Sequence, residues 1–248
     1  MKNFTQNGKQ ITFLDNRFYS NGDSTYVPSV TTILQAYPKD ASYFQWLKAN
    51  GEESDNIRDE AGRRGSVVHD LTERYDNGEE INIMNENGYI GYKLQEWAMF
   101  EKYVDYTNRF KSKIIHNEIN IVSKSLGFAG TIDRVIELNG KTMLIDIKTS
   151  NAIYDSYWLQ LAAYEQLLTG HYGHNPIEEV GILWLNAKTR TNGKGDAIQG
   201  IGWQFVTRSE AEKEKDWDLF LATQKLWLAQ NGTMQPRQLT YQITHQKS

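Results

Sequence analysis

The chain has 248 residues, of which 39% are hydrophobic, 12% aromatic and 23% charged. This is the composition of a globular protein and excludes disorder as the overall state. The formal net charge of −4 argues against a uniformly basic surface that coats nucleic acid, but it allows a local groove of Lys and Arg. The sequence contains no cysteine, which excludes disulfides, iron–sulfur clusters and thiolate zinc sites, so any metal must have oxygen or imidazole ligands.

Neither a signal peptide nor a membrane span is expected. Residues 1–8 have no apolar stretch, and no run of about 18 apolar residues occurs in the chain. We therefore expect a soluble, cytoplasmic protein without a membrane partner.

The N-terminal part predicts one hairpin followed by helices. Short apolar runs separated by turn residues indicate a hairpin over residues 11–20. Ser29 precedes an apolar segment and is expected to cap a helix. Further helices are expected at 42–49, at about 57–75 and at about 89–110. The apolar stripe expected on the last of these comprises Ile90, Leu94, Trp97, Glu101 and Val104.

The central part changes to a period of two, which is typical of strands. A strand near residues 115–121 would direct Ile115, Ile119 and Ile121 to one face and Glu118 and Asn120 to the other. Two more strands, at about 127–138 and 142–149, are joined by Asn139-Gly140, a strong signal for a tight hairpin turn.

The C-terminal part predicts alternating helices and strands. A helix over about 156–168 would begin at Asp155 or Ser156 and end at Gly170. Strands are expected at 180–185 and 201–206. The final helix would begin at Ser209, whose spacing to Glu212 is that of a capping box, and continue to Gly232.

This order of elements favours an α/β fold with a mixed central sheet flanked by helices. We expect one domain over residues 1–248. Within it, an N-terminal hairpin and helices occupy 1–112, the chemically informative motifs occupy 61–168, and the last strands and helix occupy 177–232.

The most informative residues lie on the two strands of the Asn139-Gly140 hairpin. Asp146 and Lys148 share one face of their strand, and the hairpin register brings Asp133 opposite Asp146. Opposed carboxylates destabilise a sheet, so a bound cation is the natural compensation, and two carboxylates with open positions suit Mg²⁺ or Mn²⁺. Lys148 could orient or deprotonate an attacking water during phosphodiester hydrolysis. The alternative is a surface hairpin with a weak, exposed ion pair.

Five motifs in this order resemble those of RecB-like exonucleases of the PD-(D/E)XK superfamily, of the phage and mitochondrial genome maintenance type. The first two are Ser29-Val30-Thr31-Thr32-Ile33-Leu34 and the helical G-x-x-x-H segment that ends in His69. The others are Gly130-Thr131-Ile132-Asp133, Ile145-Asp146-Ile147-Lys148-Thr149, and the Gln160/Tyr164 pair, which shares one helical face. The resemblance covers residues 29–168 and implies the restriction-endonuclease-like core of that superfamily.

The resemblance assigns roles to the matching positions. His69, Asp133, Asp146 and the backbone carbonyl of Ile147 would bind Mg²⁺ or Mn²⁺, and Lys148 would be the catalytic lysine. Gln160 and Tyr164 would shape the site and touch DNA. Without cysteine, the chain cannot belong to the members with an iron–sulfur cluster. Two further acids are candidate ligands from their positions alone: Glu73, one turn after His69, and Glu118, on the polar face of its strand.

Basic and aromatic residues are candidates for nucleic-acid contact. Arg63 and Arg64 precede His69 on one helix, although neighbouring acids could instead pair with them. The loop residues Lys188, Arg190 and Lys194 could grip phosphates or form an ordinary solvated loop. Four aromatic residues could stack on unpaired bases, although core packing is favoured for most of them: Tyr37, Tyr43, Phe44 and Trp46.

We therefore expect a metal-dependent DNA exonuclease of replication, recombination or repair in a phage-infected or bacterial cell, acting on DNA with a free end. The preference for an exonuclease comes from the resemblance. The alternatives are a structure-specific endonuclease of the same superfamily and a non-catalytic DNA-binding accessory protein.

Overall fold

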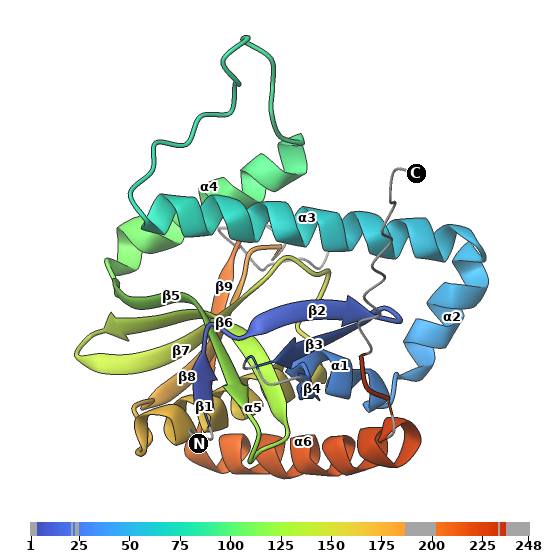
Figure 1. Cartoon of the computed structure of the whole chain (residues 1–248). Helices are drawn as coiled ribbons and strands as arrows, with labels where there is room; N and C mark the ends of the chain where they lie inside the picture. Colours follow the sequence, from blue (N-terminus) through green and yellow to red (C-terminus); the bar gives the residue numbers. More distant parts are fainter. Residues whose placement is uncertain (1–3, 21, 23–24, 187–201, 233, 237–248) are drawn as a thin grey trace, which may run out of the picture.

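The computed structural model describes residues 4–20, 22, 25–186, 202–232 and 234–236, which form two sheets surrounded by helices (Figure 1). The larger sheet has six strands in the order β1-β5-β6-β7-β8-β9, and the smaller has the order β2-β3-β4. The strands are β1 (Phe4–Gln6), β2 (Lys9–Phe13), β3 (Asn16–Ser20), β4 (Tyr26–Pro28), β5 (Lys113–Ser123), β6 (Phe128–Leu138), β7 (Lys141–Lys148), β8 (Glu179–Trp184) and β9 (Gln204–Arg208).

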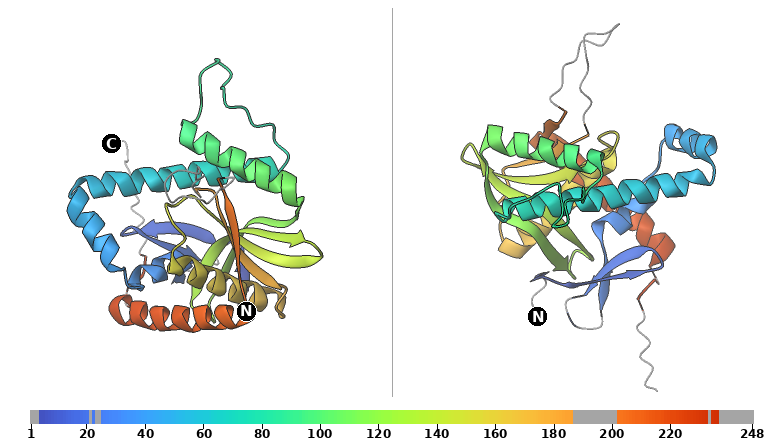
Figure 2. Two further views of the ribbon diagram at one scale, coloured as in Figure 1. Left: turned by 180° about the vertical axis from the view of Figure 1, so that it is seen from behind. Right: turned by 90° about the horizontal axis from the view of Figure 1, so that it is seen from above.

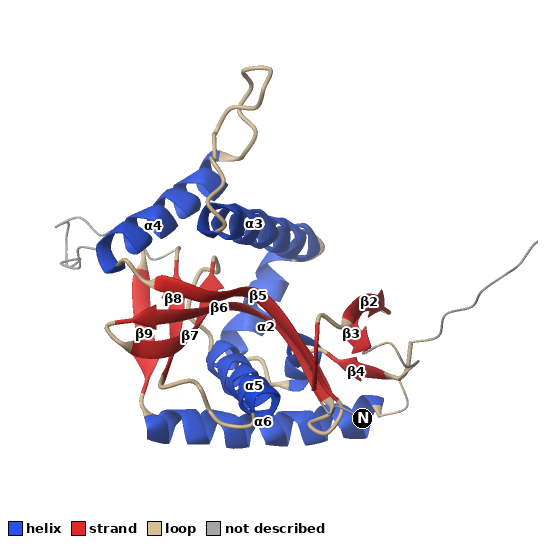
Figure 3. Ribbon diagram, turned by 60° about the vertical axis from the view of Figure 1, so that its left-hand side comes forward, coloured by secondary structure: helices blue, strands red, loops and turns tan. Residues whose placement is uncertain are grey.

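Helices cover both faces of the larger sheet. In Figure 3, α3 and α4 lie on one side of it, and α5 and α6 lie on the other. The helices are α1 (Val30–Ile33), the short 3₁₀ helix η1 (Leu34–Ala36), α2 (Ala41–Asn50), α3 (Glu53–Asp76), α4 (Leu94–Phe110), α5 (Asp155–Tyr172) and α6 (Glu210–Asn231).

The larger sheet is mixed, as the sequence predicts. The pairs β1–β5, β5–β6 and β6–β7 are antiparallel, whereas β7 and β8 are parallel and are connected through α5. The edge strand β9 is antiparallel to β8. A parallel pair needs a long crossover connection, and α5 supplies it.

Two cores lie on opposite faces of this sheet. On β7, Met143, Ile145 and Ile147 pack with residues of α3 and α4, while Leu144 packs with residues of α5 and α6. Because both faces of β7 are covered, its middle reads as a nearly continuous apolar run. Asp146 shares the face of Leu144, so it is directed toward α5.

Helix α5 lies between the sheet and α6. Ten of its residues are buried, including polar Gln160 and Glu165, as expected for a helix with neighbours on several sides. Its predicted ends are wrong: Tyr154 is the N-cap rather than Asp155 or Ser156, and the helix continues past Gly170 to Gly173, which has a left-handed φ of 79°. A glycine at this position terminates a helix without steric cost.

The predicted start and stripe of α4 are also wrong. The helix begins at Leu94 rather than near residue 89, and both Ile90 and Leu94 are exposed. Its buried face instead contains Glu96, Met99, Phe100, Tyr103 and Tyr106. Glu96 can be buried because Arg63 of α3 pairs with its carboxylate, so a charged residue occupies a position that periodicity assigns to solvent.

Strand β5 departs from simple alternation. A shift of register between Ile114 and His116 leaves Ile115 exposed, whereas Ile119 and Ile121 are buried as predicted. A β-bulge adds one residue to one strand and so changes which face the preceding side chains occupy.

Several local predictions are confirmed. The β2–β3 hairpin spans the predicted region, and Asn139 and Gly140 adopt left-handed φ angles of 53° and 79° in the β6–β7 turn. The Ser29 side chain accepts the Thr32 N–H at the start of α1. At the start of α6, the Ser209 N–H donates to Glu212, forming the predicted capping box.

Helix α2 carries aromatic residues that are not part of either core. None of its residues is buried, and Phe44 is 52% exposed, so the expectation of core packing is wrong for Tyr43, Phe44 and Trp46. Tyr37, by contrast, packs against the core. Figure 2 shows α2 at the end of α3 that is remote from the larger sheet, which explains this exposure.

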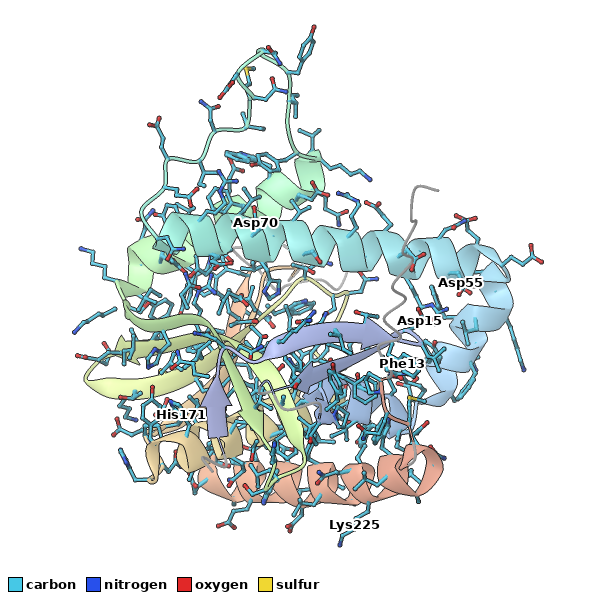
Figure 4. The ribbon with its side chains drawn as sticks, in the orientation of Figure 1. Phe13, Asp15, Asp55, Asp70, His171 and Lys225 are labelled. Carbon is cyan, nitrogen blue, oxygen red and sulfur yellow. The ribbon has the colours of Figure 1, made fainter. Side chains whose placement is uncertain are left out.

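Helix α6 covers α5 with one face only. Phe220 and Trp227 are buried, while Lys225 is exposed and projects away from α5 in Figure 4. None of the helices in the described part of the chain has the length and apolar character needed to cross a membrane.

Candidate active site

The site begins where the β6–β7 ladder ends. The last paired residues are Arg134 and Ile145, which is the register that the hairpin turn predicts. One residue further, the Asp133 carboxylate takes the place of a backbone partner: its Oδ2 accepts the Ile147 N–H at 2.8 Å. Asp133 and Asp146 are thereby held on neighbouring strands.

Asp146 and Lys148 form a nearly buried ion pair. Lys148 Nζ lies 2.5 Å from Asp146 Oδ2, and the two side chains are 15% and 2% exposed. Lys148 also donates to Gln160 Oε1 at 3.0 Å, and its Nζ lies 4.3 Å from the centroid of the Tyr157 ring. A cation–π contact of this kind adds stabilisation to the ammonium.

Gln160 links the strand to the helix. Its Nε2 donates to Asp146 Oδ1 at 3.2 Å and to the Tyr164 hydroxyl at 3.0 Å. The Tyr164 ring in turn lies against Gly130, where a Cβ atom would overlap it. The structure therefore brings together the predicted residues Asp146, Lys148, Gln160 and Tyr164.

His69 reaches the site from α3. Its Nδ1 lies 3.6 Å from Asp133 Oδ1 and 3.8 Å from Glu118 Oε1. One ligand atom from each of these three residues lies within 4.8 Å of the others, and within the described residues this is the one group that could hold a metal ion in this way. Asp146 lies outside this group.

Glu118 has an unusual backbone for a residue inside a strand, with a φ of 50°. This left-handed conformation costs a non-glycine residue on the order of 1 to 2 kcal/mol. Glu73, the other candidate acid, is not in the group with His69. Burial, and after it the nearby Glu118 carboxylate, raises the pKa of Glu73.

The electrostatics of the site follow from burial and from its mixed charges. Burial raises the pKa of Asp146 to about 6, an effect that the Lys148 ammonium opposes. Burial lowers the pKa of Lys148, but Asp146 and Asp133 raise it by more, so it lies above its ordinary value. Burial likewise lowers the pKa of His69, and the Asp133 and Glu118 carboxylates raise it by more.

The residues present fit a divalent cation. Ligand atoms from two carboxylates and one imidazole lie within 4.8 Å of one another, and carboxylates together with one imidazole form a donor set that Mg²⁺ or Mn²⁺ accepts. His69, Glu118 and Asp133 would hold the ion. Asp146 and the Ile147 carbonyl stay predicted ligands.

The candidate DNA-binding residues have different surroundings. Arg63 pairs with Glu60 and with Glu96 of α4, and Arg64 donates to Gln95 at 3.4 Å, so both arginines also join α3 to α4. Lys188, Arg190 and Lys194 lie outside the described residues.

Sequence reasoning missed two residues next to the site. Tyr157 faces the Lys148 ammonium. Arg134 is 1% exposed and binds Asp76 and Glu118. The signal for Arg134 was available in the sequence, because a charged residue directly before the apolar run Val135-Ile136 needs a buried partner.

The fold and the site together define an α/β protein with a candidate cation site of carboxylates and imidazole beside a buried lysine. Residues 41–239 match the PD-(D/E)XK nuclease superfamily. This match covers most of the chain, and the protein belongs to that superfamily, whose nucleases use divalent metals. The expected PD-(D/E)XK fold is thereby confirmed.

Solved structures and curated proteins add little to this. A crystal structure of a "putative exonuclease" from Eubacterium rectale is 13% identical, covering 74% of this chain and 77% of that one, with a TM-score of 0.39. The structure of SSO0001 is 14% identical, covering 52% and 58% of the two chains, with a TM-score of 0.25. No curated protein matches the chain.

Proposed function

We propose that the protein is a Mg²⁺- or Mn²⁺-dependent DNA exonuclease of the RecB-like type, acting at a free DNA end. The observation that carries the proposal is the meeting of His69, Asp133, Asp146 and Lys148, contributed by α3, β6 and β7. Burying charged groups costs folding free energy, and clusters of such groups concentrate at binding and catalytic sites.

A divalent cation bound there would activate a water molecule and neutralise charge on a phosphoryl oxygen. The residues of the chain supply the remaining functions. Lys148 presents an ammonium that stabilises negative charge developing on the phosphate. Gln160 holds this ammonium and the Asp146 carboxylate at fixed separation through two hydrogen bonds.

Exposed aromatic residues and arginines support a nucleic-acid substrate. Helix α2 presents Tyr43, Phe44 and Trp46 outside the core, and aromatic rings stack on unpaired bases without regard to sequence. Arg63 and Arg64 stay proposed DNA contacts, as do Lys188, Arg190 and Lys194.

The test is incubation of purified protein with end-labelled linear single-stranded DNA, linear duplex and covalently closed circles, in Mg²⁺, Mn²⁺ or EDTA. We expect linear DNA to be degraded to short products with either metal, circles to stay intact, and EDTA to stop cleavage. Cleaved circles would favour a structure-specific endonuclease. Binding without cleavage in every metal would favour an accessory protein.

Two variants assign the activity to this site. Lys148→Met is expected to lower kcat by about 100 to 1,000-fold, the usual effect of losing a donor that stabilises transition-state charge. Lys141→Met is the matched control, because exposed Lys141 lies at the far end of the same strand and pairs with Glu179 there. Equal activity of both variants would contradict the proposed role of Lys148.

A further inference from the structure

Arg134 is the largest of the fully buried side chains in the described part of the chain. Its guanidinium is held on several sides: Nε donates to Asp76 Oδ2 at 2.5 Å, Nη2 to Thr72 Oγ1 at 3.1 Å, and Nη1 to the Asp133 carbonyl at 2.7 Å. Burying an arginine is expensive unless its charge and donors are satisfied, and here they are.

These contacts connect the elements that carry the candidate metal ligands. Arg134 follows Asp133 on β6, and its Nη1 also lies 3.4 Å from Glu118 Oε1 on β5. On α3, Thr72 accepts from Arg134 and donates to the backbone carbonyl of His69 at 2.9 Å. One guanidinium is therefore bonded to the strand of Asp133, to the carboxylate of Glu118 and, through Thr72, to the backbone of His69.

We propose that Arg134 is a positioning residue for the cation site, holding His69 and Glu118 at the distances from Asp133 that allow one ion to be shared. This inference rests on the proposed function, because it takes these three side chains as ligands. Outer residues that orient the ligands of a metal commonly change its affinity by about 10 to 100-fold.

Asp76 completes the arrangement by balancing the charge of Arg134. Its Oδ2 accepts from both Arg134 and the Tyr103 hydroxyl, the latter at 2.6 Å, and its side chain is 4% exposed. Because the Asp76 carboxylate balances the charge of the guanidinium, the Glu118 carboxylate keeps enough negative charge to bind a cation. Loss of the Asp76 charge would leave Arg134 to compete with a cation for Glu118.

The test measures Mn²⁺ affinity of the full chain without DNA, by isothermal titration calorimetry and by electron paramagnetic resonance of free Mn²⁺. Three variants weaken the arrangement to different degrees: Thr72→Val removes the hydrogen bonds of the Thr72 hydroxyl to Arg134 and to the His69 carbonyl, Asp76→Asn removes the balancing charge, and Arg134→Met removes the guanidinium. We expect the Mn²⁺ Kd to rise at least threefold for Thr72→Val and at least about tenfold for Asp76→Asn.

Glu165→Gln is the matched control. Glu165 and Lys213 form another ion pair between helices, 2.7 Å long with both side chains 5% exposed, and it joins α5 to α6. This variant should also lower thermal stability, because the buried Lys213 ammonium loses its buried carboxylate partner and keeps the pair with exposed Glu210, but it should bind Mn²⁺ within twofold of the wild type.

The outcomes separate this inference from the proposed function. Weaker Mn²⁺ binding by folded Thr72→Val and Asp76→Asn, with unchanged binding by Glu165→Gln, supports the role of Arg134. Thr72→Val and Asp76→Asn are sufficient for the test even if Arg134→Met does not fold. Wild-type Mn²⁺ affinity in both Thr72→Val and Asp76→Asn would overturn the proposed role of Arg134. It would also be overturned if Glu165→Gln weakened Mn²⁺ binding as much as these two variants do. Asp133→Asn is the reference: unchanged binding in this variant too would mean that the cation site itself is wrong.

Discussion

The Tyr164 ring occupies the space that a Cβ atom on Gly130 would need. This contact limits how closely α5 approaches β6, and on α5 itself Tyr164 accepts a hydrogen bond from Gln160. The glycine of the G-x-x-D motif is thus required for close packing of the helix that carries Gln160, and its φ is not left-handed.

Gly130→Ala is expected to push the Tyr164 ring away and to lower the cleavage rate by about 100-fold, because small displacements of aligned groups have large kinetic effects. Overpacking should also lower the free energy of unfolding by about 1 to 3 kcal/mol. Nuclease assays and urea denaturation measure the two effects. Gly62→Ala is the control, since no atom outside its own helix lies near a Cβ at that position. Full activity of Gly130→Ala would contradict the packing argument.

Gln160→Leu removes the side chain that joins Asp146, Lys148 and Tyr164. We expect kcat to fall by about 10 to 100-fold while KM for DNA changes little, because the residue orients catalytic groups rather than holding substrate. Steady-state kinetics on a labelled oligonucleotide distinguish the two parameters. Gln224→Leu on α6, which loses a hydrogen bond to the Leu126 carbonyl in the β5–β6 turn, should leave both parameters unchanged. A rise in KM alone would assign Gln160 to DNA binding instead.

Variants of Glu118 separate its contribution to cation binding from the cost of its left-handed backbone. Glu118→Gln should weaken Mn²⁺ binding by about tenfold, because a neutral amide is a poorer ligand for a hard cation. Glu118→Gly should lose the same affinity yet stay within about 1 kcal/mol of wild-type stability, because relief of the left-handed strain offsets the added flexibility of the unfolded chain. Calorimetric titration and urea denaturation provide the two numbers. Undiminished Mn²⁺ affinity in Glu118→Gln would remove Glu118 from the ligand set.

Glu212 predicts a pH dependence of stability at the start of α6. The Ser209 hydroxyl, the Ser209 N–H and Arg208 lower the pKa of Glu212 from 4.5 to about 2. A depressed carboxyl pKa stabilises the fold above the unfolded value, and this contribution is lost as the pH falls from about 4.5 through 2. The stability difference between wild type and Glu212→Gln should therefore be largest above pH 5 and shrink below it. Urea denaturation between pH 7 and pH 3 measures this, and a constant difference would contradict the prediction.

Local sequence determined the parts of the site that lie close together in the chain. Asn139-Gly140 specifies a turn that leaves two strands in one register, so Asp133 and Asp146 become neighbours. Strand alternation then puts Lys148 beside Asp146, and helical spacing puts Gln160 and Tyr164 on one face. Each of these relationships depends on backbone geometry repeated over a few residues, which a pattern in the sequence reports directly.

Only the tertiary structure decided which distant residues join them. Glu118, which has a left-handed backbone within β5, lies 3.8 Å from His69 of α3, and Glu96 is buried because Arg63 of another helix pairs with it. Arg134 finds its partners 58 and 62 residues away in the chain. Such contacts depend on how whole elements pack and on whether buried charges can be paired, and no local periodicity carries that information.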